Sequence, residues 1–190
     1  MKRSLIVAVP VAALTIGATM GGASGGATAT AVLRDANGAE MGTVKVVTSG
    51  NSAQVIAYVH APAAAAGFHG FHIHSRGLCD PNAVDPATNL VVPFYSAGGH
   101  LGGTAGQTHP GHDGDMPSLL VNKNGSAQLR FKTDRVDLAK ILDADGSAVI
   151  VHAGPDNFAN IPARYSATGP DTATLNTGDS GGRSYCGMFQ

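Results

Sequence analysis

The chain has 190 residues, of which 43% are hydrophobic and 13% are charged, so it is long enough for one globular domain with a sizeable core. Nothing in this length or composition calls for a second domain. A formal net charge of −1 argues against the basic footprint of nucleic-acid-binding proteins, so we expect no nucleic-acid partner.

Residues 1–29 have the pattern of a secretory signal peptide. Two basic residues precede an apolar run at 5–16, and a small-residue tract follows in which Ala27 and Ala29 have the spacing of a cleavage site. The apolar run is shorter than the ~20 residues that a membrane-spanning helix needs, which favours cleavage over a membrane anchor. We therefore expect no stable membrane span and an exported domain at 30–190, retained in the periplasm or envelope or secreted.

Export changes how the two cysteines are interpreted. In an oxidising compartment Cys79 and Cys186 are expected to form a disulfide, with two unrelated free thiols as the alternative. Closing a loop of this size stabilises a fold by about 4–5 kcal/mol in the chain-entropy model.

Removal of the signal peptide leaves ten Lys and Arg against thirteen Asp and Glu, a formal charge of −3.

Short alternating runs separated by turn residues predict an all-β fold. Asn37-Gly38 and Asn124-Gly125 are strong hairpin signals, and one short helical turn is expected within 136–142. The predicted strands are 30–34, 41–48, 53–60, 67–75, 118–121, 127–132, 147–152 and 183–189. About eight strands with almost no helix indicate a β-sandwich or a Greek-key barrel.

The strand at 67–75, with the sequence GFHGFHIHS, places two histidines on one face. Side chains at i and i+2 of a strand leave the same face, so His72 and His74 lie about 7 Å apart along it. Phe71 and Ile73 point the other way into the core. One strand can therefore serve both a packed interior and a metal site.

Two long loops, 75–117 and 153–182, interrupt the strand pattern. Compact domains rarely contain loops of this length unless they are functional or disordered. The first loop contains His100, His109 and His112, which favours a functional interpretation.

Six histidines and one carboxylate have positions that a metal site could use. They are His72, His74, His100, His109, His112, His152 and Asp115. Imidazole suits zinc and copper, and this set contains no thiolate. Seven ligands exceed the needs of one tetrahedral ion, so two sites with a shared ligand fit better than one over-supplied site.

Over residues 30–190 the sequence resembles the copper/zinc superoxide dismutases of the exported bacterial type. The matching segments are GFHGFHIHSRGLCDP, SAGGH, HPGHDGDMP, VIVHAGPDN and GDSGGRSYCG. The resemblance implies an eight-stranded Greek-key β-barrel, an immunoglobulin-like arrangement of strands, with the site between the two long loops.

The resemblance also implies a role for each site residue. It implies copper ligands at His72, His74, His100 and His152. It implies zinc ligands at His100, His109, His112 and Asp115, so that His100 bridges the two metals. It further implies that Asp156 supports a ligand of each metal, that Arg183 orients the substrate anion, that Thr177 lies at the channel rim, and that Cys79 pairs with Cys186.

The implied reaction is the disproportionation of superoxide to oxygen and hydrogen peroxide. Copper would change oxidation state, zinc would be structural, and the bridge at His100 would release copper and take up a proton during the cycle. Arg183 and His100 are thus the expected catalytic residues. The zinc subloop is short, since only two residues separate His109 from His112.

Two other functions remain open at this point. A non-enzymatic metal-binding or copper-delivery protein could use the same barrel, and a zinc hydrolase would need a free carboxylate beside an open zinc. His69 is expected to be a buried structural histidine and His60 a solvated one. The sequence leaves the oligomeric state open and is compatible with a homodimer.

Overall fold

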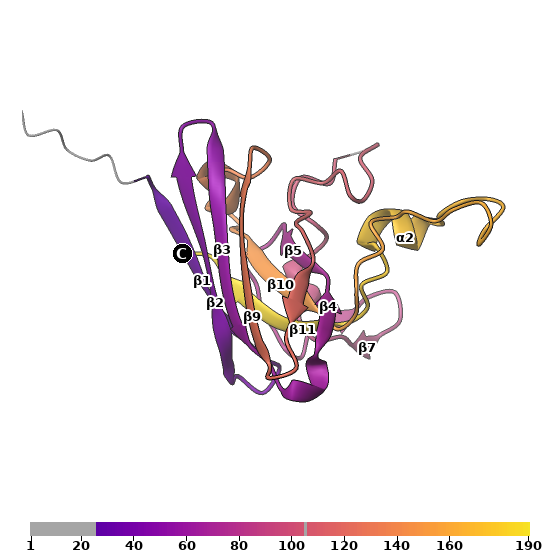
Figure 1. Cartoon of the computed structure of the whole chain (residues 1–190), viewed down its shortest axis with the longest axis horizontal. Helices are drawn as coiled ribbons and strands as arrows, with labels where there is room; N and C mark the ends of the chain where they lie inside the picture. The colour runs from indigo at the N-terminus through magenta and orange to yellow at the C-terminus, as the bar shows by residue number, and fades with distance from the viewer. Residues whose placement is uncertain (1–25, 105) are drawn as a thin grey trace, which may run out of the picture.

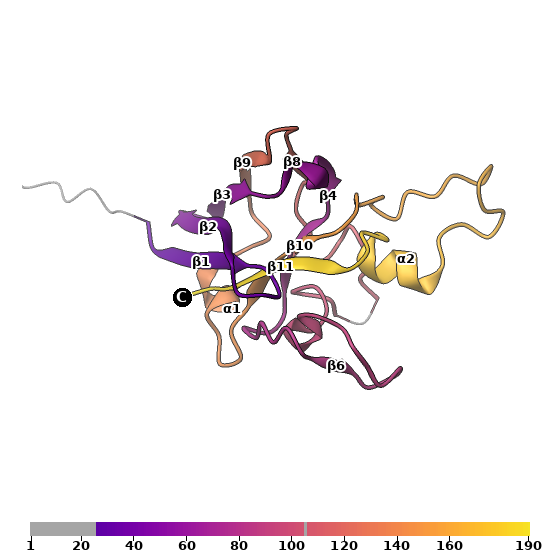
Figure 2. The same cartoon turned by 90° about the horizontal axis from the view of Figure 1, so that it is seen from below.

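A curled antiparallel sheet of seven strands forms most of the molecule (Figures 1 and 2). The structure is a computed structural model that describes residues 26–104 and 106–190. The strand order is β5-β10-β11-β1-β2-β3-β9. The strands are β1 (Thr28–Arg34), β2 (Glu40–Ser49), β3 (Ser52–His60), β5 (Phe71–His74), β9 (Ser126–Thr133), β10 (Ala148–His152) and β11 (Arg183–Met188).

A second strand pair connects the two edges of this sheet. β4 (Gly67–His69) pairs with β8 (Leu119–Val121), and β4 continues through Gly70 into β5 while β8 continues through a turn into β9. Counting β4 and β5 as one interrupted strand gives eight barrel strands among the described residues. Because β3 and β4, like β9 and β10, are consecutive in the chain but not paired, the connectivity is of the Greek-key kind. The predicted all-β class is confirmed.

Buried side chains at alternate positions along the strands form the core. Ala29, Ala31 and Leu33 on β1 are buried between exposed neighbours, and β3 follows the same period of two. β5 and β10 differ, because all of their residues are buried. The loops cover their outer face, and this is where the histidines lie.

The predicted strand at 67–75 is wrong in one respect, because it is divided into β4 and β5 at Gly70. The Gly70 amide donates to the carbonyl of Gly154, and the Gly70 carbonyl accepts the His152 amide, both at 2.8 Å. A Cβ at position 70 would lie 2.4 Å from the Cβ of Ser180. The close approach of these chain segments therefore requires glycine here.

Both long loops extend from the same side of the barrel and contain structure that the sequence did not predict (Figures 1 and 2). The first contains a small hairpin of β6 (Val84–Asp85) and β7 (Leu90–Val91) and a 3₁₀ turn, η2 (Tyr95–Ala97). The second contains α2 (Thr172–Thr177).

Two further short helical elements complete the fold. The helical turn expected within 136–142 is α1 (Leu138–Ile141), and η1 (Ala63–Ala65) precedes β4.

The predicted disulfide is present, joining Cys79 in the first long loop to Cys186 on β11 with a Cα–Cα distance of 5.7 Å. The first long loop is therefore covalently tied to the barrel.

The predicted signal peptide, residues 1–29, lies outside the described residues except at its end. There, Thr28 and Ala29 already belong to β1 and pair with Val47 and Val46. The sheet thus begins two residues before the predicted domain boundary. Within the described part of the chain, no helix has the length and apolar character needed to cross a membrane.

Candidate metal centre

Backbone pairing brings the histidines together from three parts of the chain. β5 and β10 are neighbours in the sheet, and they position His72, His74 and His152. The first long loop runs beside β5, where the Leu101 amide donates to the carbonyl of Ile73 at 2.8 Å. His100 consequently lies next to His74, with ring centroids 4.9 Å apart.

Four histidines form one compact cluster, which we call the four-histidine group. Each offers a ring nitrogen, and these atoms all lie within 4.8 Å of one another. The members are His72, His74, His100 and His152. They are the residues for which the sequence predicts copper binding.

Three of these imidazoles are oriented so that one nitrogen is bound and the other is free. His72 Nε2 lies 2.8 Å from Asp156, His74 Nδ1 2.9 Å from the Gly98 carbonyl, and His152 Nδ1 3.1 Å from the Gly181 carbonyl. Their remaining nitrogens are buried and have no hydrogen-bond partner. Leaving such an atom unsatisfied costs about 1–3 kcal/mol. Three unpaired nitrogens aimed at one point fit a metal ion, with the outer partners fixing each ring.

Asp115 is the centre of a second cluster, the Asp115 group. Its carboxylate oxygens lie 2.7 Å from His100 Nδ1, 3.0 Å from His109 Nδ1 and 3.1 Å from His112 Nδ1. These are the four residues for which the sequence predicts zinc binding. The tightest set, with all ligand atoms within 4.8 Å of one another, contains His72 in place of His112. His112 thus contacts the carboxylate but stands further from the other rings.

Asp156 joins the two clusters. Its buried carboxylate accepts from His72 Nε2 and His109 Nε2, both at 2.8 Å, and from the Phe158 amide at 2.7 Å. The Phe158 ring stacks on His109 with centroids 6.1 Å apart. Asp156 therefore orients one ring of each cluster, as its sequence context predicts.

Burial keeps three imidazoles of the four-histidine group neutral. It lowers the pKa of His100 to about 4 and that of His152 to about 3, and it holds the pKa of His74 well below its usual value. Neighbouring histidines add to the effect. Neutral imidazole is the form that binds one metal ion, so His74 and His152 need lose no proton to do so, whereas a ring that bridges two ions must also give up its N–H proton.

The Asp115 group has the opposite electrostatics. Burial opposes the charged form of His109, but its hydrogen bonds to Asp115 and Asp156 outweigh burial and raise its pKa to about 9. Burial likewise opposes ionisation of Asp115 and of the neighbouring Asp156, yet hydrogen bonds from the histidines hold the pKa of each carboxyl well below its usual range. At neutral pH this cluster pairs two carboxylates with an imidazolium.

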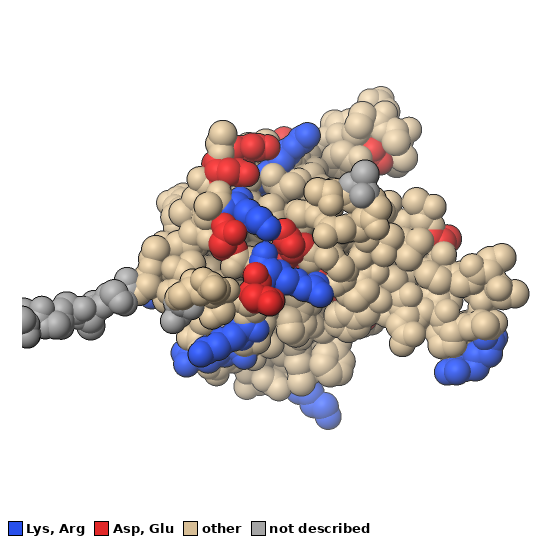
Figure 3. Space-filling view, turned by 90° about the horizontal axis from the view of Figure 1, so that it is seen from above, with Lys and Arg blue, Asp and Glu red and all other residues tan. Residues whose placement is uncertain are grey.

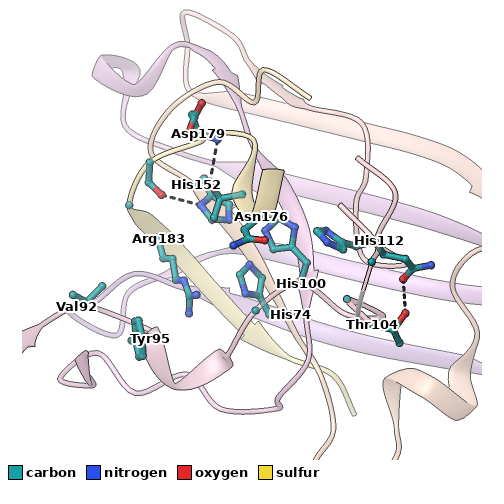
Figure 4. A pocket seen from close by; sticks show the side chains of 17 residues that line it. His74, Val92, Tyr95, His100, Thr104, His112, His152, Asn176, Asp179 and Arg183 are labelled. Carbon is teal, nitrogen blue, oxygen red and sulfur yellow. Dashed lines mark hydrogen bonds between the residues drawn. The ribbon is translucent and has the colours of Figure 1, made fainter. Parts of the chain in front are cut away.

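A cavity of about 880 Å³ opens over the four-histidine group (Figure 4). Figure 4 shows His74, His100 and His152 gathered on one side of it and Arg183 beside them. Thr177, the predicted rim residue, also lines the cavity, and its hydroxyl donates to the Ala173 carbonyl at 2.8 Å. The arrangement leaves room for a small anion next to the histidines.

Arg183 is held by the first long loop. Its guanidinium donates to the carbonyls of Phe94 at 2.5 Å and Gly98 at 2.7 Å, and it lies 5.7 Å from the Tyr95 ring. Gly98 also accepts from His74, so one carbonyl positions both the arginine and a histidine. Burial lowers the pKa of Arg183, which nevertheless stays cationic because its ordinary value is so high.

The two remaining histidines match their predicted roles. His69 is buried, with Nδ1 2.7 Å from the His152 carbonyl and Nε2 2.7 Å from the Ala65 carbonyl, whereas His60 is exposed. Sequence reasoning missed Gly98 and Phe158. The glycine pair at 98–99 beside His100 was a usable signal for the former, and the latter had none.

The fold and the two clusters define a Greek-key barrel built to hold two metal ions close together. The copper/zinc superoxide dismutase family model matches residues 40–189, so the chain belongs to that family.

Individual relatives agree with this assignment. The chain is 46% identical over 128 residues to the Cu-Zn superoxide dismutase of Mycolicibacterium paratuberculosis, covering 65% of this chain and 56% of that protein. It is 33% identical over 133 residues to the one from Deinococcus radiodurans, covering 66% and 64%. The match thus spans about half to two thirds of these relatives' length.

Solved structures show the same architecture. The Cu/Zn superoxide dismutase from Brucella abortus superposes with a TM-score of 0.65 at 26% identity, over 86% of this chain and 100% of that chain. A SOD-like protein from Bacillus subtilis shares the fold, with a TM-score of 0.61 at 23% identity, over 84% of this chain and 96% of that chain.

Proposed function

We propose that this protein disproportionates superoxide, converting two superoxide anions and two protons into oxygen and hydrogen peroxide. The observation that carries the proposal is the set of three buried, unpaired imidazole nitrogens, two of them on histidines that line one cavity together with a cationic arginine. Family membership supports the same conclusion.

The two clusters suit different metals. His72, His74, His100 and His152 would hold copper, and His100, His109, His112 and Asp115 would hold zinc, with His100 shared. Copper, when bound, supplies the one-electron exchange between two oxidation states that this reaction needs. Zinc has no redox chemistry and suits a structural role.

The protein's own groups bind the anion and handle the proton. The Arg183 guanidinium attracts superoxide into the cavity and orients it, since a converging positive charge steers a small anion. Figure 3 shows, on the face that it draws, charges of both signs intermixed and few charged side chains on the protruding loops. The charge proposed to act on the anion is that of Arg183, which lines the cavity. His100 binds Asp115 through Nδ1, so its other nitrogen, Nε2, is the atom that takes up and delivers a proton.

Superoxide removal by the full exported chain, loaded with copper and zinc, tests the proposal. We expect activity that chelation abolishes, and an Arg183→Ala variant with unchanged metal content and a rate roughly 10- to 1,000-fold lower, since a focused charge raises the association rate of a small ion on this scale. Arg130→Ala, on the exposed face of β9, is the matched control. A fully loaded protein without activity would favour the rival copper-binding function.

We also propose export after cleavage near residue 29. The apolar run at 5–16 supports it, and mass determination of the mature protein tests it. A mature chain that begins at Thr30 would lack the first two residues of β1. Sedimentation of the same sample would decide whether the protein is the homodimer with which the sequence is compatible.

A further inference from the structure

We propose that Arg135 is a positioning residue for zinc, because it fixes the short chain segment that carries two of the proposed zinc ligands. The segment is residues 109–113, called here the 109–113 segment. The inference rests on the proposed zinc-binding role of the Asp115 group. It concerns a residue outside both clusters.

The two histidine side chains of the 109–113 segment bond to Asp115 and Asp156, but few hydrogen bonds join its backbone to the rest of the fold. The His109 amide donates to the carbonyl of Leu175 on α2 at 2.7 Å, and the Gly111 amide closes a local turn onto Thr108. One side chain contacts two of its carbonyls: Arg135 Nη1 lies 2.7 Å from the Pro110 oxygen and 3.4 Å from the His112 oxygen, which also accepts the Asp115 amide at 3.2 Å. The guanidinium thus holds the backbone between the two histidines.

Arg135 itself is firmly anchored. It lies two residues after the end of β9, its amide donates to the Thr133 hydroxyl at 3.1 Å, and the next residue, Val136, is buried in the barrel core. A charge-assisted bond from an anchored guanidinium to a carbonyl is stronger than a neutral one. The end of the barrel strand therefore provides a support for the backbone of a loop whose other contacts are made mainly by its histidine side chains.

A second cation supports the same segment from α1. Lys140 Nζ lies 2.5 Å from Asp113, and the two side chains are 47% and 24% exposed. Exposed ion pairs of this kind contribute little. Lys140 contacts one carboxylate side chain, whereas Arg135 contacts two backbone carbonyls on either side of Gly111, so Arg135 acts more directly on the backbone between the histidines.

Arg135 also has an opposing effect, because a positive charge near the Asp115 group repels a divalent cation. This repulsion is screened by solvent, since Arg135 is exposed, whereas the restriction of the loop is local and direct. Outer groups that orient metal ligands typically change metal affinity by roughly 10- to 100-fold. We expect orientation to outweigh repulsion.

The test is a zinc titration of the metal-free protein against a chromogenic chelator, with Arg135→Ala, Arg135→Lys and Arg130→Ala variants. We expect Arg135→Ala to weaken zinc binding about tenfold. Arg135→Lys should recover most of the affinity, because it retains a donor and the charge. Copper affinity and the Arg130→Ala protein should remain at wild-type values.

Cobalt(II) bound in place of zinc provides a readout that general destabilisation would not change. Its visible absorption reports ligand geometry, and we expect it to shift in Arg135→Ala and to return in Arg135→Lys. Unchanged zinc affinity in Arg135→Ala, or an increase caused by relief of repulsion, would overturn the inference. A wild-type protein that takes up no zinc would instead refute the proposed zinc group.

Discussion

The metal centre has a strand side and a loop side, and the two are held by different forces. On the strand side, His72 and His74 alternate with Phe71 and Ile73, both fully buried, and β5 is in register with β10. On the loop side, the histidines are held mainly by hydrogen bonds to two carboxylates. Core packing therefore governs one side, while charge and hydrogen bonding govern the other.

The largest expected effect comes from cutting the covalent link between the first long loop and the barrel. A Cys79→Ser/Cys186→Ser double variant should lose about 4–5 kcal/mol of unfolding free energy, because the unfolded chain regains its loop entropy. Denaturant unfolding measures this, and the reduced wild-type protein should behave in the same way. A loss below about 1 kcal/mol, the scale of an ordinary hydrogen bond, would mean that other contacts hold the loop.

The next effect concerns the strand side. Ile73→Ala should lower the unfolding free energy by about 2–5 kcal/mol, because it opens a cavity in the core on the inner face of the strand that carries His72 and His74. Ile56 on β3 is only half-buried, so Ile56→Ala is a matched control with a smaller expected loss. Equal losses in the two variants would contradict the assignment of core packing to this side.

On the loop side, Asp156→Asn should weaken zinc binding by roughly 10- to 100-fold, or about 1.4–2.7 kcal/mol. The amide retains the shape of the carboxylate but cannot accept from both histidines with full charge. Asp171→Asn, which caps α2 in the same loop, should leave zinc affinity unchanged. The competition titration described for Arg135 measures both variants.

The smallest effect is a pH dependence that should differ between the two clusters. His109 has its pKa raised to about 9 and must lose a proton to bind zinc, so zinc affinity should increase about tenfold per pH unit over roughly pH 6 to 8. Over the same range His74 and His152 are already neutral and add no such slope to copper binding. Calorimetry in buffers of different ionisation enthalpy counts the protons released.

In the metal-free protein, raising the pH should have the opposite kind of effect, because it should lower the unfolding free energy instead of raising an affinity. Because the folded-state pKa of His109 lies above the unfolded value of about 6.5, its protonated form stabilises the fold below that pH. This stabilisation should be lost as the pH rises through about 9.

Zinc uptake that does not vary with pH would contradict the imidazolium at His109.

The strand side could be predicted well from the sequence, because its signals are local. Alternation placed Phe71 and Ile73 in the core, and the Asn-Gly turn defined the first hairpin. The division at Gly70 was missed, although a glycine inside a strand pattern indicates close backbone approach. Its cause, the contact with Ser180, lies 110 positions away in the chain.

The loop side could be predicted only in its residue types. α2 has an Asp171 cap and ends at Gly178 with φ +61°, but six residues are too few for a helical period to be readable. The place of His72 beside the Asp115 group depends on how the loop folds against β5, which no local pattern encodes. Arg135 was also missed, because its partners are backbone carbonyls rather than side chains.

The Gly98 carbonyl has a consequence for how this centre could be altered. It accepts hydrogen bonds from both His74 and Arg183, and Gly98 adopts φ +76°, a conformation that other residues rarely adopt. Any substitution that shifts this peptide moves the proposed metal ligand His74 and the proposed anion receptor Arg183 together. In the proposed function, redox tuning and substrate capture are thus mechanically linked through one peptide group, and changes that improve one independently must arise elsewhere in the chain.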